Sequence, residues 1–506
     1  MLDAIGVEEL SAPEHIPQAP LDDLSGVLDS SEAGGRIVRG GIVRFASYAA
    51  MIGLSVLAAA LLTRHLGVIR FGYYTTVLSL VAVVSAITDA GMSTIGAREY
   101  AVRDGIEREL LMRDLLGLRI VLTALGVLLV TGFAFAAGYG SELLLGAVLA
   151  SLGTIALVIQ HTHTIPIAAA LRLGTLAALE LGRQVLSVAA IVVLVALGAG
   201  VLPLLAVVLA VNVALIAPTA ALARHQLSLR ASLRPRHWLA LLRLTISFSL
   251  ASALGTLYIY TAQILTSLVT SAHQSGLFAA SFRIFVVLGT LPALLTSGAL
   301  PLLARAARDD RQRLAYALRR IFEVSLILGV AAALATLAGA QFMIEVVAGP
   351  KYAASVEVLQ IQGAALIATF ALAGWSFALL SLERYKGLLL ANLAAFLVSC
   401  TLTIVLASSS GATGAALATL CGESVLALGL LAALRHGHPE LAPRPGIILK
   451  VALAAAPAVA LGLLPRTPSL LRMVLALGAY GLMVLLTKAV PREMLELLPS
   501  RLRRTG

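Results

Sequence analysis

Charged side chains are scarce in this sequence, and long polar segments are rarer still. Only 12% of the 506 residues are charged, 59% are hydrophobic, and the mean hydropathy is +0.96. About a quarter of the residues of a soluble domain are charged, so this chain lacks the polar side chains that a water-soluble surface needs. The composition predicts an all-α polytopic membrane protein, because helices satisfy their own backbone hydrogen bonds within lipid.

Cysteine is nearly absent too. Cys400 and Cys421 both lie in apolar runs, so no disulfide framework is indicated.

The net charge of +11 is spread over many short loops and forms no basic stripe with interleaved aromatics, so no nucleic-acid partner is expected. His161 and His163 fit no metal-binding spacing. We expect neither a metal nor a cofactor.

Residues 1–35 contain no Lys or Arg, but they contain eight acids and three prolines. A secretory signal requires a basic start and an apolar middle, and this segment has neither. We expect a disordered, acidic cytoplasmic tail. A docking segment for a partner is the alternative.

Apolar runs follow one another from residue 36 onward, each long enough for the ~20 residues that cross a bilayer. Fourteen such runs are centred near residues 54, 82, 126, 154, 189, 211, 255, 290, 332, 368, 394, 421, 455 and 480. The connections between them are short. They leave no room for a large domain outside the membrane.

Basic residues predict the orientation, because Lys and Arg are retained in short cytoplasmic loops. If the first helix starts inside, 30 of the 37 Lys and Arg fall on the cytoplasmic side, including Arg44, Arg98 and Arg119, and five fall on the other. The remaining two, Arg183 and Arg283, fall inside spans. We therefore expect a multi-pass membrane protein with both termini in the cytoplasm.

Two similar stretches lie 204 residues apart: RFGYYTTVLSL around Gly72 and QSGLFAASFRI around Gly276. Six predicted helices separate them, so both copies have the same orientation in the membrane, as in transporters with parallel repeats. This pattern predicts an N-lobe of helices one to six (36–225) and a C-lobe of helices seven to twelve (226–435). A C-terminal helix pair with a basic tail (436–506) follows.

Four stretches carry a family signature. The first runs from Arg64 through Leu66-Gly67, Phe71-Gly72-Tyr73 and Asp89-Ala90-Gly91 to Arg98-Glu99, and the others are AASFRI at 279–284, SLERYK at 381–386 and GATGAALATLCGE at 411–423. Together they resemble bacterial polysaccharide and O-antigen flippases of the multidrug/oligosaccharidyl-lipid/polysaccharide exporter superfamily. The resemblance runs from about residue 36 to about residue 435. At Gln263 the sequence departs from it, since many relatives have an acid in that helix.

The resemblance implies a flippase of the bacterial inner membrane that uses alternating access. Its substrate would be a polyprenyl-pyrophosphate-linked oligosaccharide, a repeat unit of O-antigen, capsule or exopolysaccharide, moved from the cytoplasmic to the periplasmic leaflet. Lipid-linked oligosaccharide and membrane lipids are the implied partners, and other polysaccharide assembly proteins are candidates. Two alternatives stay open, a drug or small-solute exporter of the same superfamily and a membrane-embedded glycosyltransferase or polymerase. The periplasmic loops are tiny and nearly free of acids, which argues against an enzyme.

Residues that can hold pyrophosphate or sugar are the binding candidates. Arg183 lies about ten residues into helix five, ~15 Å deep, and Arg283 lies about a third of the way into helix eight. An arginine fork binds phosphate oxygens bidentately, so we expect these two to clamp the pyrophosphate between lobes. The alternative for Arg183 is an ion pair with Glu180 in the same helix. The alternative for Arg283 is a side chain that snorkels to the outer interface. Further binding candidates are Arg44, Arg119, Gln160, His161 and Gln263.

The candidates for gating or coupling are mainly acids. Asp89 and Glu99 flank Arg98 at the end of helix two, and we expect a carboxylate to pair with the guanidinium there and latch the cytoplasmic gate. Glu180 is expected to orient Arg183. Glu423 is either a proton carrier or a polar contact between helices. Glycines such as Gly67, Gly72 and Gly91 permit tight turns or close helix approach.

Overall fold

The computed structural model describes residues 31–487 and 489, apart from 90–91, 171, 224–230, 233, 293–310, 383, 442 and 444. The chain forms two units, Met1–Ile52 and Gly53–Gly506. In the first unit the described part is the beginning of one helix, which starts at Ser31 within the predicted tail. The rest of that tail and the basic C-terminal tail lie outside the described residues.

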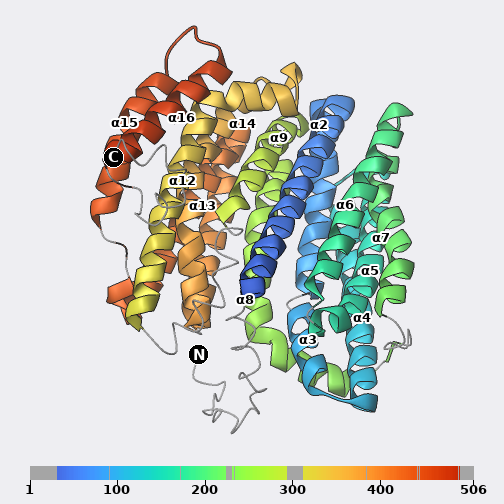
Figure 1. Cartoon of the computed structure of the whole chain (residues 1–506). Helices are drawn as coiled ribbons and strands as arrows, with labels where there is room; N and C mark the ends of the chain where they lie inside the picture. Colours follow the sequence, from blue (N-terminus) through green and yellow to red (C-terminus); the bar gives the residue numbers. More distant parts are fainter. Residues whose placement is uncertain are drawn as a thin grey trace, which may run out of the picture. The chain divides into compact units, whose positions relative to one another are not determined.

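All regular structure in the described residues is helical (Figure 1). The first group of helices comprises α2 (Ser31–Asp89), α3 (Met92–Val102), α4 (Gly105–Ala136), α5 (Ser141–Ala169), α6 (Leu173–Ala196) and α7 (Val201–Ala223). The second comprises α8 (Pro235–Val269), α9 (Ala272–Gly289), α12 (Arg311–Val347), α13 (Ser355–Ser381) and α14 (Tyr385–Gly437). Last come α15 (Pro445–Gly462) and α16 (Ser469–Leu486), with the short 3-10 helices η1 (Pro350–Tyr352) and η2 (Pro439–Leu441) along the way.

Two helices, α2 and α14, are kinked, and each corresponds to two of the fourteen predicted spans. The backbone is left-handed at Gly67 in α2 (φ 71°) and at Gly411 in α14 (φ 59°), a conformation that glycine adopts without steric cost. Each of these helices therefore contains two predicted spans. Within the described residues, nine helices are long and apolar enough to cross a membrane, the two kinked ones among them. The prediction of an all-helical, multi-pass membrane protein is confirmed.

Within the second unit, each group of helices packs around a central member. α5 contacts α3, α4, α6 and α7, whereas α13 packs between α12 and α14 and also contacts α9. The red pair α15 and α16 in Figure 1 packs on α12. Small residues permit these close contacts: Ala147 and Ala150 of α5 are fully buried, in the same core as the larger Leu204 and Leu205 of α7. This packing of small side chains is typical of helices associating in lipid.

The two groups of helices meet where α2 and α9 cross. A Cβ atom on Gly72 would lie only 2.9 Å from the backbone nitrogen of Gly276, so the two glycines of the predicted repeat touch each other. Phe71, Phe278 and Tyr352 belong to one apolar core around this crossing. We call this end of the bundle the glycine end and the opposite end the α3 end. The expected roles of Gly67 in a turn and Gly72 in close packing are confirmed, and Gly91 lies outside the described residues.

Hydrogen bonds reinforce the contact at the glycine end. Thr63 Oγ1 donates to the Val347 carbonyl at 2.8 Å, and Arg64 Nη2 donates to the Val346 carbonyl at 2.7 Å. Farther along, the backbone N–H of Ala412 donates to Gln274 Oε1 at 3.0 Å. The first two bonds join α2 to α12 and so connect the two groups, whereas the third joins α9 to α14 within the second group. In this structure the two groups are therefore held together at the glycine end.

Candidate functional site: a buried arginine cluster and an acidic pocket

Arg119 is a completely buried cation, with 0% of its side chain exposed. Its Nη2 donates to Asp89 Oδ1 and, at 2.6 Å, to Ser93 Oγ, while its Nη1 donates to Thr162 Oγ1 at 3.1 Å. Since α4 has 32 residues, more than a span requires, Arg119 can lie near the membrane boundary and still be enclosed by neighbouring helices. A charge buried in this way depends on its partners.

The ion pair of Asp89 differs from the one expected. The sequence predicts a pair with Arg98, but the carboxylate bonds to Arg119, and the Arg98 side chain is exposed. Glu99 pairs instead with Arg103 at 2.9 Å. The reason is geometric: α2 ends at Asp89 and the separate helix α3 begins at Met92, so Arg98 lies on a different helix that turns it outward.

The predicted ion pair of α6 is present. Arg183 Nη2 donates to Glu180 Oε2, and the other oxygen of the same carboxylate, Oε1, lies 4.0 Å from His161 Nε2. All three side chains are about one-third exposed. Charged groups within spans usually face the bundle interior or a water-filled cavity, because exposure to lipid is costly. Their partial exposure leaves all three side chains accessible to a ligand.

These residues form one group, the arginine cluster: Asp89, Ser93, Arg119, His161, Thr162, Glu180 and Arg183. Adjacent residues of α5 connect the two ion pairs, because Thr162 accepts a hydrogen bond from Arg119 and His161 Nε2 lies 4.0 Å from Glu180 Oε1. Two arginines face two acids, so the cluster is balanced at its formal charge. Sequence reasoning missed Ser93 and Thr162, because single hydroxyls in apolar runs carry no distinguishing pattern.

Other predicted binding residues lie elsewhere. Gln160 is buried in α5 with its Oε1 unpartnered among the described residues. Arg44 belongs to α2, and its side chain is outside the described part of the structure. Arg283 Nη2 donates to Ser55 Oγ at 2.8 Å and borders an otherwise apolar cavity of about 230 Å³ between α2, α9 and α12. No described contact joins it to Arg183, so the clamp between lobes stays a prediction.

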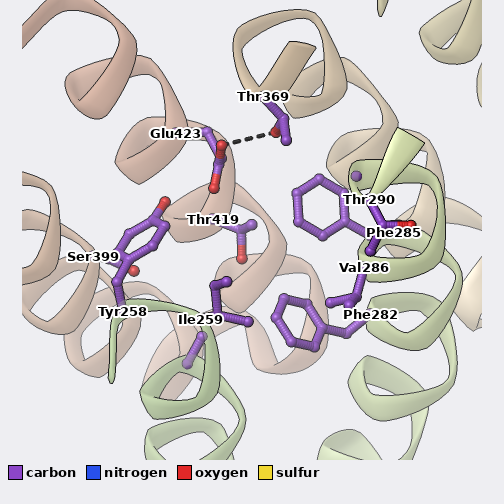
Figure 2. Close-up of a pocket in the computed structure, with 12 residues that line it drawn as sticks. Tyr258, Ile259, Phe282, Phe285, Val286, Thr290, Thr369, Ser399, Thr419 and Glu423 are labelled. Atoms are coloured by element: carbon purple, nitrogen blue, oxygen red, sulfur yellow. Dashed lines mark hydrogen bonds between the residues drawn. The ribbon is translucent and has the colours of Figure 1, made fainter. Parts of the chain in front are cut away.

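Glu423 occupies a separate pocket between α8, α9, α13 and α14, with a volume of about 130 Å³ (Figure 2). The side chain is 6% exposed, and its Oε2 accepts a hydrogen bond from Thr369 Oγ1 at 2.8 Å. The Tyr258 hydroxyl lies beside the same carboxylate, outside ordinary hydrogen-bond geometry. Among the described residues no cation pairs with Glu423. The polar contact between helices predicted for this acid is therefore present, through Thr369.

Gln263 connects the two groups of helices. From α8, its Nε2 donates to Thr76 Oγ1 of α2 at 3.3 Å and to Ser275 Oγ of α9 at 3.0 Å. All three side chains are 2% exposed. The neutral amide thus makes a buried polar contact near the glycine end, at the position where an acid is common in the resembling family.

The helical arrangement resembles that of solved transporter structures. A structure titled lipid II flippase MurJ in an inward closed conformation matches with a TM-score of 0.76 at 12% identity, covering 89% of this chain and 98% of that one. An inward-facing multidrug resistance MATE family transporter of the MOP superfamily matches at 0.61 and 11% identity, covering 77% and 94%. An outward-facing MATE transporter matches at 0.53 and 15% identity, covering 79% and 96%. The chain therefore shares its fold with these transporters.

The sequence identifies the family. A family model described as polysaccharide biosynthesis protein matches residues 61–357, more than half of the chain. The chain therefore belongs to the polysaccharide biosynthesis protein family, and the family predicted from sequence motifs is confirmed. No curated protein sequence matches the chain significantly.

Proposed function

We propose that the protein is a flippase for a polyprenyl-pyrophosphate-linked oligosaccharide, acting by alternating access in a bacterial inner membrane. Family membership and the transporter fold support transport of a polysaccharide precursor. The arginine cluster is the observation that carries the proposal. Arg119 and Arg183 are cations held within helices by neighbouring carboxylates, where a charge without function is costly.

The chemistry of the substrate fits this cluster. A pyrophosphate offers several charged oxygens, and a guanidinium binds two of them at once through parallel hydrogen bonds. Glu180 and Asp89 hold the arginines in place while the site is empty of phosphate. A pyrophosphate that enters beside Arg183 replaces the Glu180 carboxylate as its partner.

The proposed direction follows the basic residues. With the α3 end and both termini in the cytoplasm, the arginine cluster lies at the cytoplasmic side, where the substrate is made, and the glycine end is periplasmic. The close approach of Gly72 to Gly276 supports a conformation closed at the periplasmic side. Opening then separates Gly72 from Gly276.

Glu423 is the proposed coupling residue. A carboxylate without a cationic partner is costly to keep charged inside a membrane protein. The Glu423 pocket has room beside the carboxylate, with Thr369 and Tyr258 as polar neighbours. We infer that Glu423 takes up and releases a proton or another cation as the two groups of helices change position.

The test is transport by arginine variants in vesicles that contain a fluorescent lipid-linked oligosaccharide. Arg183→Ala should abolish translocation at equal protein abundance. Arg183→Lys should restore part of it, because an ammonium retains the charge but loses the bidentate fork. Glu180→Gln should be milder than Arg183→Ala.

A dye-efflux assay tests the alternative that the protein is a drug exporter. Two of the structures with this fold are titled multidrug resistance transporters. Arginines repel a cationic dye, so we expect no efflux by the wild type. Efflux of a cationic dye that survives Arg183→Ala, with no movement of lipid-linked sugar, would replace the flippase proposal with the exporter.

A further inference from the structure

Two adjoining cavities at the glycine end are used by neither the arginine cluster nor the Glu423 pocket. The first has a volume of about 210 Å³, and its polar lining is Tyr73, Thr76, Tyr139, Ser267 and Ser275. The second, of about 320 Å³, shares Tyr73 with the first and adds two charged residues, Arg70 and Glu142. We call the two together the tyrosine vestibule.

The vestibule lies between the two groups of helices. Tyr73 and Thr76 belong to α2 and Tyr139 to the turn between α4 and α5, whereas Ser267 and Ser275 belong to α8 and α9. A hydrogen bond of 3.3 Å between the Tyr139 and Ser267 hydroxyls crosses from one group to the other. Any opening of the glycine end therefore widens the vestibule and breaks this bond.

A buried amide lies behind the hydroxyl wall of the first cavity. Gln263 is 2% exposed and donates to Thr76 and Ser275, both of which line the cavity. Its Oε1 has no hydrogen-bond partner among the described residues. Buried polar atoms are nearly always paired, so this oxygen calls for a donor that enters from the cavity once Thr76 and Ser275 shift. A ligand hydroxyl is such a donor.

The lining of the first cavity is neutral and rich in hydroxyls. Burial, together with the neighbouring Tyr73, raises the pKa of the Tyr139 phenol, so its hydroxyl keeps the proton and can donate. Tyrosine combines an apolar ring face with a polar tip. A sugar ring has the matching pattern of C–H faces and equatorial hydroxyls. A drug-sized ligand usually needs roughly 300 Å³ or more, so this smaller cavity fits a single ring.

We propose that the tyrosine vestibule is a saccharide subsite, distinct from the arginine cluster, which holds one sugar ring of the substrate near the periplasmic exit. The proposal rests on the proposed flippase function for its direction. Tyr73 and Tyr139 provide the ring faces and their hydroxyls. Thr76, Ser275 and the Gln263 amide provide the hydrogen bonds that select among hydroxyl patterns.

Saturation-transfer NMR on the detergent-solubilised full-length protein tests this subsite. The probes are glucose, galactose, mannose and N-acetylglucosamine, each without a lipid. At least one should receive saturation from the protein. Tyr73→Leu and Tyr139→Leu should each weaken its apparent affinity roughly tenfold, the size expected for loss of one aromatic contact and its hydroxyl.

Matched variants keep the result interpretable. Tyr385→Leu replaces an exposed tyrosine at the start of α14, and it should leave sugar binding unchanged. Tyr73→Phe should retain most of the affinity, because the ring face remains. If a leucine variant does not fold, Ser267→Trp serves in its place, since it fills the cavity from α8 and should abolish binding.

Two results would overturn the proposal: no transfer to any of the four sugars, or transfer that is unaffected by Tyr73→Leu, Tyr139→Leu and Ser267→Trp. The flippase function is scored separately, by translocation of the lipid-linked oligosaccharide. Translocation without vestibule binding rejects the subsite alone. Failure of both measurements rejects the flippase as well.

Discussion

Arg119 is the residue whose environment is most demanding, because a fully buried guanidinium needs a counter-charge. Asp89→Asn retains a hydrogen-bond acceptor but removes that charge. We expect a loss of about 1–3 kcal/mol in unfolding free energy, below the value for a fully buried pair because Asp89 is 38% exposed. Thermal unfolding in detergent measures it. Arg98→Ala is the control, and an equal loss in both variants would contradict the assigned ion pair.

Glu423 is the residue at which coupling is tested. Glu423→Gln has nearly the same volume and can still accept from Thr369, so the fold should persist. Removing the ionisable group should abolish the dependence of transport on an imposed ion gradient. The measurement is the rate of lipid-linked sugar movement with and without a proton or sodium gradient. A variant that responds to the gradient like the wild type would show that Glu423 is only a polar contact.

Single residues also show where sequence reasoning succeeds and where it stops. The ion pair of Glu180 and Arg183 follows from helical spacing alone, because residues three apart share a face. The bond from Asp89 to Arg119 joins residues thirty positions apart on different helices, and no local pattern predicts it. The departure at Gln263 was visible in the sequence. Its bonds to Thr76 and Ser275 depend on how three helices meet.

At the scale of helices, the apolar runs predicted the spans well, because span length depends only on hydropathy. The kinks were not predicted. At Gly67 and Gly411 one helix ends and the next begins without a loop, so hydropathy predicts two spans where the structure has one kinked helix. The arginine cluster shows the same limit, since it draws on α2, α3, α4, α5 and α6. The periodicity of apolar residues does not predict which helices pack against one another, because that depends on the tertiary structure.

The crossing of α2 and α9 gives a prediction at this scale. A methyl group at Gly72 would meet the Gly276 backbone at 2.9 Å, and backbone cannot move aside as a side chain can. Gly72→Ala should therefore disfavour closure of the glycine end and slow transport. Cysteine accessibility at this end should rise in step.

Gly132→Ala is the matched control, because Gly132 lies in α4 with nothing within 4 Å of an added Cβ. Alanine is favoured over glycine within helices by about 0.5–1 kcal/mol, so this variant should be neutral or slightly more stable. Normal transport and accessibility in Gly72→Ala would show that the close approach is not needed for closure.

For the whole molecule, the first question is orientation in the membrane. The proposed topology places Ser271 and Ser409 outside the cell and Lys386 inside. Cysteines at the first two positions should react with a membrane-impermeant reagent in intact cells, and one at Lys386 should react only after permeabilisation. All three side chains are exposed in the structure, so access is not limited by packing. Labelling of Lys386→Cys in intact cells would contradict the proposed topology, and with it the proposed direction of transport.

The central claim is that the whole molecule moves a lipid-linked oligosaccharide between leaflets, and leaflet accessibility measures this most directly. Vesicles with and without the purified protein would contain a fluorescent polyprenyl-pyrophosphate oligosaccharide, and an impermeant reductant added outside would irreversibly quench the label of every molecule that reaches the outer leaflet. The account predicts that quenching exceeds the half expected for a static, symmetric membrane only in vesicles with protein, approaching completion. Equal quenching with and without protein, at confirmed insertion, would contradict it.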